Sequence, residues 1–256
     1  MVRLAANLSM MFTEWDFMDR FQEAAEAGFQ AVEFLFPYDY PAGDIAAALQ
    51  RNGLTQALFN LPPGDWAKGD RGMASIPARR EEFRAGVKRA ISYAVATGAR
   101  RLHVMSGLGA RADKSAAAAY TDALRYACDK AGPCGIDILI EPINGRDMPG
   151  YFLNDFGYAA DLIAELALPN LRLQFDIYHR QILQGDVING LRTLFPLIGH
   201  VQIASVPARH EPGSGELDDF RVLRELDAMG YAGFVGCEYR PAAGTLAGLS
   251  WRAGLS

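Results

Sequence analysis

The sequence has little of what marks secreted, membrane or nucleic-acid-binding proteins. It holds three cysteines and no CxxC pair, which argues against a disulfide framework and against a structural zinc site. Lys and Arg number 25 against 30 Asp and Glu, so the excess positive charge that phosphates require is missing. No charge-free apolar run of about 18 residues and no targeting segment appears. We therefore expect a cytoplasmic protein that binds neither nucleic acid nor membrane.

What the sequence does contain is a regular alternation of short apolar runs and longer amphipathic segments. Half of the 256 residues are hydrophobic (50%), enough to bury one large core. The apolar runs predict eight strands: Arg3–Ser9, Ala31–Phe36, Thr55–Leu61, Arg101–Ser106, Asp137–Asn144, Leu171–His179, His200–Ser205 and Phe234–Tyr239. Eight strands that alternate with helices predict a single (β/α)₈ TIM barrel over residues 1–256. An open doubly wound sheet is the alternative, but the first strand lacks its Gly-rich phosphate turn.

Oxygen-bearing side chains stand at or near the ends of four consecutive predicted strands. They are Glu141, Asp176, Gln202 and Glu238. In a TIM barrel the carboxyl ends of the strands carry the active site, so these groups should converge. Three buried carboxylates need a compensating cation, and carboxylate and amide oxygens suit Mg²⁺ or Mn²⁺. The sequence thus predicts a divalent metal site, unless each acid pairs with an arginine of a nearby loop.

Several motifs resemble the hydroxypyruvate isomerase family, a group of xylose isomerase-type TIM barrels. They are LIEPIN with RDMPGYF after it, FDIYH, HVQIA followed by PARHEPGSGELD, and CEYRP. The resemblance implies that Glu141 and Glu238 form the proton-transfer pair and that His179 and Arg209 contact the substrate. Related epimerases bind a metal through Glu, Asp, His and Glu. This chain has Gln202 in place of that His, which leaves open the metal's identity and whether it is obligatory.

The same resemblance implies a small hydroxy-keto acid as the substrate. Two opposed carboxylates would move a carbonyl between adjacent carbons, from hydroxypyruvate to tartronate semialdehyde, through an enediolate. Within the fold, 2-oxo-tetronate isomerase and ketose 3-epimerase remain alternatives. A DNA-repair nuclease would need more than the four histidines present, and a binding protein without turnover would not need both glutamates. The apolar helix faces leave room for a homo-oligomer.

Other positions are further candidates for the pocket. Asn60 and His103 end or lie on the third and fourth predicted strands and are expected to bind substrate. Glu33 lies within a strand and is expected to be a core acid paired with a neighbour. Two loops, 62–79 with Trp66 and 145–154 with Phe152, exceed ordinary βα connections and should cover the substrate or pack. Trp66 and Phe152 suit either role, covering the substrate or packing.

Overall fold

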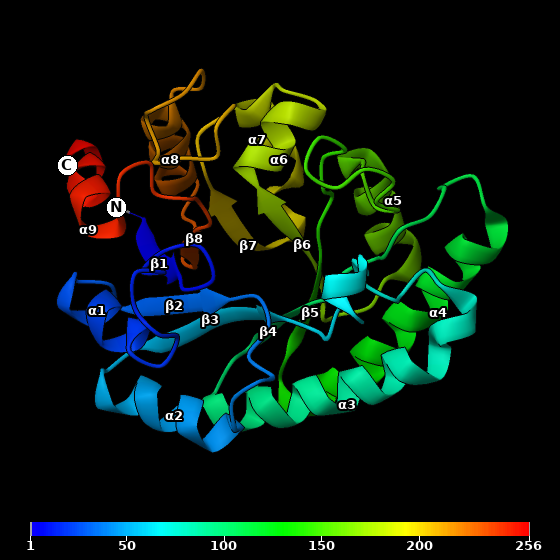
Figure 1. Ribbon diagram of the computed structural model, residues 1–256. Helices are drawn as coiled ribbons and strands as arrows, with labels where there is room; N and C mark the ends of the chain where they lie inside the picture. The colour runs from blue at the N-terminus through cyan, green and yellow to red at the C-terminus, as the bar shows by residue number, and fades with distance from the viewer. Residues whose placement is uncertain (1, 256) are drawn as a thin grey trace.

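Eight parallel strands close into a barrel in sequential order in the computed structural model, which describes residues 2–255 (Figure 1). The strands are β1 Arg3–Asn7, β2 Ala31–Phe34, β3 Thr55–Asn60, β4 Arg101–His103, β5 Asp137–Ile140, β6 Leu171–Asp176, β7 Ile198–Ile203 and β8 Phe234–Cys237. The first strand pairs with the last in parallel, with Ala5 opposite Gly236. The predicted (β/α)₈ barrel is therefore confirmed.

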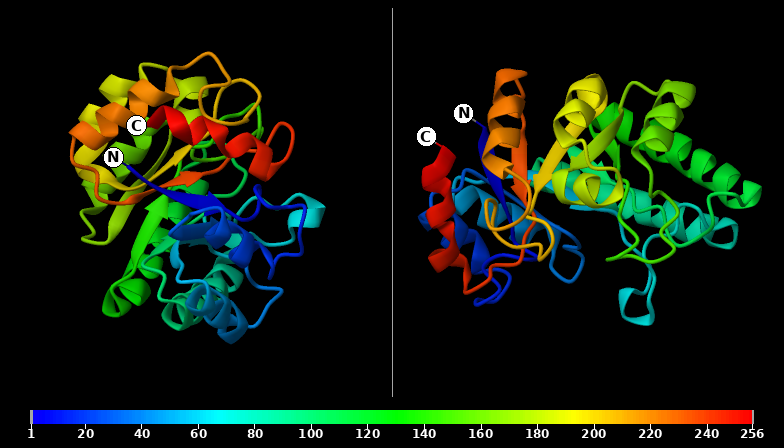
Figure 2. Two further views of the ribbon diagram at one scale, coloured as in Figure 1. Left: turned by 90° about the vertical axis from the view of Figure 1, so that its left-hand side faces the viewer. Right: turned by 90° about the horizontal axis from the view of Figure 1, so that it is seen from above.

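Helices surround the barrel and cover the outer faces of the strands (Figures 1 and 2). The α-helices are α1 Arg20–Glu26, α2 Ala42–Arg51, α3 Arg80–Thr97, α4 Lys114–Ala131, α5 Phe156–Leu166, α6 Ile177–Leu183, α7 Val187–Leu194, α8 Asp219–Ala228 and α9 Thr245–Gly248. Their apolar stripes bury residues such as Val87 in α3 and Leu124 in α4 against the strands. Among the residues described, no helix combines the length and apolar character needed to cross a membrane.

All eight predicted strands are present, but each of them ends earlier than the apolar pattern suggests. The fifth, expected to run to Asn144, ends at Ile140, and the sixth, expected to run to His179, ends at Asp176. Asp176 caps helix α6, because its Oδ1 accepts hydrogen bonds from the backbone N–H groups of Tyr178 (2.7 Å) and His179 (3.3 Å). The prediction of strand over residues 177–179 is therefore wrong, and the cap places His179 on a helix.

The inner face of the barrel is polar toward the carboxyl ends of its strands. Along β1 and β2, Ala5 and Ala31 are followed two residues later by Asn7 and Glu33. Residues two apart in a strand share a face, so the small alanines give way to polar groups along the interior. Asn7 and Glu33 are both buried and joined by a 3.0 Å hydrogen bond. The strands thus bring polar chemistry to one end of the barrel.

Candidate active site

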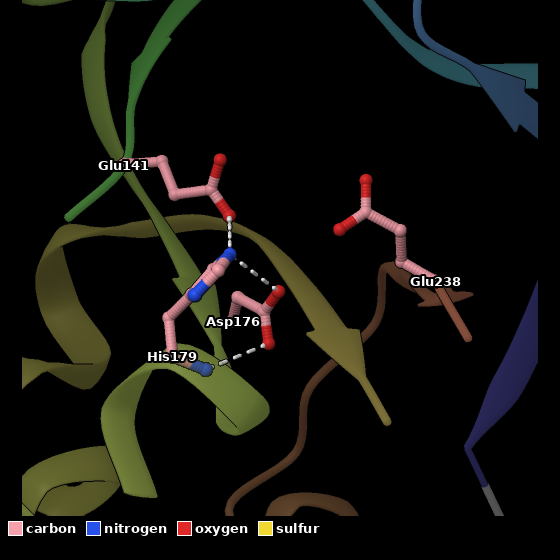
Figure 3. Close-up of side chains that lie close together, drawn as sticks. All are labelled: Glu141, Asp176, His179 and Glu238. Atoms are coloured by element: carbon pink, nitrogen blue, oxygen red, sulfur yellow. Dashed lines mark hydrogen bonds and ion pairs between the residues drawn. The ribbon is translucent and has the colours of Figure 1, made fainter. Parts of the chain in front are cut away.

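Three carboxylates and one imidazole meet at the carboxyl end of the barrel (Figure 3). Glu141 directly follows β5, Asp176 ends β6, Glu238 directly follows β8, and His179 lies in the first turn of α6. One potential ligand atom from each of the four lies within 4.8 Å of the others, and all four residues are buried. Figure 3 shows Glu141 and Glu238 reaching into the same space from opposite sides. The predicted convergence of the three acids is confirmed.

Burial makes the ionised form of these carboxylates costly. It raises the pKa of Glu141 well above its ordinary value, and the nearby Glu238 and Asp176 raise it further. Burial likewise raises the pKa of Glu238 to about 8 and that of Asp176 to about 6. Arg209 opposes both shifts, since its Nη2 lies 2.5 Å from Glu238 Oε2 and 3.8 Å from Asp176 Oδ2. One guanidinium thus faces three carboxylates.

Two of the carboxylate oxygens are buried without a partner. Within residues 2–255, neither Glu141 Oε1 nor Asp176 Oδ2 has a hydrogen-bond partner, although both are shielded from solvent. Unpartnered buried oxygens of this kind carry a large desolvation penalty. A divalent cation would satisfy them and balance the remaining negative charge, and the all-oxygen donors fit Mg²⁺ or Mn²⁺. The residues present therefore fit the predicted metal.

The surroundings of His179 fix which ring nitrogen carries the proton. Asn144 Oδ1 accepts from the backbone N–H groups of Arg146 (3.0 Å) and Asp147 (2.9 Å), which identifies the other end of the amide as the donor. That donor, Asn144 Nδ2, lies 2.7 Å from His179 Nδ1, which must accept. Burial lowers the pKa of His179 well below its ordinary value, so the ring is neutral and Nε2 carries the hydrogen. Nε2 then faces Asp176 Oδ2 at 3.6 Å as a donor, which suits the predicted substrate contact better than metal ligation.

Gln202 lies within a buried hydrogen-bonded network. Its Oε1 accepts from Gln174 Nε2 at 2.6 Å and its Nε2 donates to Glu33 Oε1 at 2.8 Å. Glu33 Oε2 also lies 2.6 Å from His200 Nε2, so the predicted pairing of Glu33 inside the core is confirmed. In this arrangement the Gln202 oxygen is already partnered, and its role as a metal ligand stays a prediction.

A cavity of about 360 Å³ opens onto the four clustered residues. Asn60 and His103, both proposed from the sequence, line it at the ends of β3 and β4. His103 Nε2 lies 3.6 Å from Glu141 Oε2, and burial lowers the pKa of His103 to about 3. The imidazole is therefore neutral at physiological pH, and it offers the cavity a hydrogen-bonding group rather than a charge.

The aromatic residues of the two long loops, Trp66 and Phe152, have different surroundings. Trp66 lines the cavity and packs on Phe36 with ring centroids 5.2 Å apart. Phe152 is fully buried and packs against Tyr120 at 5.3 Å, so its role is packing. The second loop still reaches the cavity through Asp147 and Met148.

Sequence reasoning missed several residues that line or support the site. Asn7, whose Nδ2 lies 3.4 Å from Glu238 Oε1, ends the first strand, and that position was a usable signal. Gln174 lines the cavity from within β6, where strand alternation with Asp176 indicated the inner face. Arg71 and Asp147 lie in loops, where no periodic signal points to the pocket.

Comparison with known proteins agrees with this geometry. Residues 21–254 match the family model of the xylose isomerase-like TIM barrel. A 2-oxo-tetronate isomerase from Cupriavidus necator is 52% identical, over 98% of this chain and 97% of its own. Hydroxypyruvate isomerase of Escherichia coli is 44% identical, over 98% of both chains. A solved structure from Brucella melitensis, described as an AP endonuclease of family 2, is 49% identical with a TM-score of 0.96, covering 99% of this chain and 98% of that one.

The fold, the acidic site and the matching model define the class: the chain belongs to the xylose isomerase-like TIM barrel family. Within that class it groups with the hydroxypyruvate and 2-oxo-tetronate isomerases, which it matches along nearly its whole length. The resemblance inferred from the sequence motifs is confirmed, and the chain is an isomerase of this group.

Proposed function

We propose that this isomerase interconverts hydroxypyruvate and tartronate semialdehyde. The observation that carries the proposal is the pair Glu141 and Glu238, buried and facing one another across a cavity large enough for a small acid. The name of the Escherichia coli relative supports the same substrate.

The reaction moves one proton between neighbouring carbons. One glutamate takes a proton from C3 of hydroxypyruvate, which gives an enediolate, and a glutamate carboxyl then delivers a proton to C2. The proton of the C3 hydroxyl passes to the C2 oxygen, so C3 becomes the aldehyde and C2 carries the hydroxyl of tartronate semialdehyde. In the reverse direction the acid and base roles exchange, so each carboxyl must reach both protonation states. Burial raises the pKa of both Glu141 and Glu238, which favours the protonated carboxyl that the acid role requires.

The site also suits a divalent cation, Mg²⁺ or Mn²⁺, held by Glu141, Asp176 and Glu238, with Gln202 the predicted fourth ligand. When bound, such an ion supplies positive charge that stabilises the negative charge developing on the substrate oxygens. The chain's own groups have separate tasks. His179 Nε2–H is placed to donate a hydrogen bond to a substrate oxygen, and Arg209 holds Glu238 in position by their ion pair.

A substrate one carbon longer is the second candidate, because the 52% identical relative is named 2-oxo-tetronate isomerase. The cavity of about 360 Å³ accommodates either acid. We do not propose nuclease activity, despite the description of the Brucella melitensis structure. The chain carries a formal net charge of −5, without the excess of positive charge that the phosphates of DNA require.

Deuterium incorporation tests the proposal directly. Purified protein is incubated in D₂O with hydroxypyruvate or with 2-oxo-tetronate, each with and without Mg²⁺ or Mn²⁺, and the products are followed by proton NMR. The wild-type protein should convert one acid and place deuterium on the carbon that receives the proton. Glu141→Gln and Glu238→Gln should each lose at least about 100-fold in kcat. Glu81→Gln, which removes a carboxylate whose side chain is 82% exposed on α3, is the matched control. Near wild-type kcat in either active-site variant would refute the assignment.

We also propose the setting in which the enzyme works. The hydroxy-keto acid is its only proposed partner apart from a second copy of the chain, for which the apolar helix faces leave room. A cytoplasmic location is supported by three unpaired cysteines, Cys128, Cys134 and Cys237. Two of the three are buried, and Cys237 packs in the core next to Glu238 as strand alternation predicts.

A further inference from the structure

We propose that Arg71 binds the carboxylate of the substrate, an inference that rests on the proposed function. The charged residues that line the cavity are unevenly distributed between the first and second halves of the barrel. The residues that line it from the chain segment 10–105 are Met10, Leu35, Phe36, Asn60, Trp66, Arg71, His103 and Met105. Because His103 is neutral, Arg71 is the one charged group in that half. Every acidic residue of the lining, Glu141, Asp147 and Glu238, belongs to the other half.

Arg71 is held at the cavity by its neighbour Gly72. Gly72 forms an antiparallel bridge with Ser106, just beyond β4, and its φ is +109°. A Cβ atom there would lie 2.4 Å from the backbone oxygen of Met105, so only glycine allows the loop to approach the barrel this closely. The guanidinium of Arg71 stacks over Trp66, 4.0 Å from the ring centroid. The loop therefore presents a pre-oriented guanidinium rather than a freely moving one.

The hydrogen-bonding edge of Arg71 is only partly used. Nη1 donates to two backbone oxygens, those of Asp70 (2.7 Å) and Trp66 (3.2 Å). Over residues 2–255, no acidic side chain lies within ion-pair distance of Arg71, and neither Nε nor Nη2 makes a hydrogen bond. These two N–H groups form the fork that binds a carboxylate in a bidentate manner.

The other arginines of the lining are less suited. Arg209, which the sequence motifs suggested, is already occupied by Glu238 at 2.5 Å and by Asp147 at 3.2 Å. Arg240 is exposed and lies in the acidic half, two residues beyond Glu238. A substrate carboxylate placed near either one would also meet the acids.

This division orients the substrate. The carbons that exchange a proton must lie between Glu141 and Glu238, and the carboxylate then extends toward Arg71, away from both acids. The site should therefore prefer an acid to a neutral sugar of the same length, because a sugar without a carboxylate would leave the Arg71 charge unpaired. The 62–79 loop, which carries Arg71, thus gives the site its preference for an acid over a neutral ketose.

The test compares Arg71→Gln and Arg71→Lys with Arg240→Gln and Lys68→Gln. Lys68 lies in the same loop, its side chain is 83% exposed and it is not part of the cavity, so its loss is a matched removal of charge. Binding of glycerate and of glycerol, which carries CH₂OH in place of the carboxylate, is measured by calorimetry. Turnover of hydroxypyruvate and of dihydroxyacetone, its neutral counterpart, is measured in parallel. Circular dichroism confirms that each variant is folded.

Arg71→Gln should weaken glycerate binding and raise KM for hydroxypyruvate by about tenfold to a hundredfold, with a smaller effect on kcat. Arg71→Lys should recover part of the loss, while Lys68→Gln and all values for the neutral compounds stay at the wild-type level. Unchanged glycerate binding in Arg71→Gln, an equal loss in Lys68→Gln, or a loss found instead in Arg240→Gln would overturn the inference. So would a wild-type protein that fails to bind glycerate. If the wild-type protein turns over neither acid but its glycerate binding depends on Arg71, the proposed function fails and the carboxylate site stands.

Discussion

Gly236→Ala should damage both stability and catalysis, because of what lies opposite Gly236 inside the barrel. A Cβ atom at this β8 position would lie 2.2 Å from Glu33 Oε2 and 2.4 Å from Glu33 Cδ. Glu33 has no free direction in which to move, since His200 (2.6 Å), Gln202 (2.8 Å) and Asn7 (3.0 Å) all bond to its carboxylate. Overpacking a dense core costs about 1–3 kcal/mol, and a lost bond to a buried carboxylate adds to that.

We therefore expect a total loss of about 2–4 kcal/mol in the free energy of unfolding, which lowers Tm by roughly 4–16 °C in a chain of this size. Thermal unfolding followed by circular dichroism measures the shift. The kcat should fall as well, because Asn7 links Glu33 to Glu238. Gly43→Ala is the matched control: Gly43 lies in α2 with no atom within 4 Å of its Cβ position, so its Tm should not fall. A Gly236→Ala variant that melts and turns over like the wild type would refute the reasoning.

Three further outcomes are expected. Mg²⁺ or Mn²⁺ added to EDTA-treated protein should raise the free energy of unfolding by about 2.7 kcal/mol at a hundredfold excess over Kd, and an unchanged Tm in scanning fluorimetry would contradict the metal site. The His103 imidazole should stay neutral to about pH 5, because burial lowers its pKa to about 3; a ¹⁵N NMR titration with a midpoint near 6.5 would disprove this. Asp155→Ala should cost about 1 kcal/mol in urea unfolding, since Asp155 Oδ1 caps α5 by accepting from the Tyr158 N–H at 2.7 Å, whereas Asp155→Asn should keep most of that stability.

The barrel could be predicted because its strands are buried on both faces. A run such as Asp137–Ile140 is apolar enough to stand out between amphipathic helices, and eight such runs admit few other topologies. The ends of the strands were harder to predict, because the apolar pattern continues into the next element. Ile177 and Tyr178 extend the pattern of β6 and are buried, yet they belong to α6. What ends the strand is the Asp176 cap, a local hydrogen bond that periodicity does not report.

The three clustered acids could also be predicted, since each ends or directly follows a strand and parallel strands end at one rim. The partners that define their chemistry could not. Which nitrogen of His179 carries the proton depends on Asn144, itself fixed by the backbone of residues 146 and 147. Arg71 reaches the cavity only because Gly72 permits a close approach to Met105. These contacts join segments distant in sequence or depend on the backbone geometry of a loop. Neither feature leaves a periodic pattern in the sequence from which it could be predicted.

The polar interior next to the site explains how such an acidic cluster is held in place. On one side, Asn7 Nδ2 hydrogen-bonds to Glu33 and to Glu238. On the other, Glu33 bonds to Gln202, which bonds in turn to Gln174, a side chain whose hydrogen bonding lowers the pKa of Glu141. The Glu33 carboxylate thereby connects to both Glu141 and Glu238 through neutral amides. Amides transmit position without adding a further charge, so the barrel interior helps to set the spacing of Glu141 and Glu238.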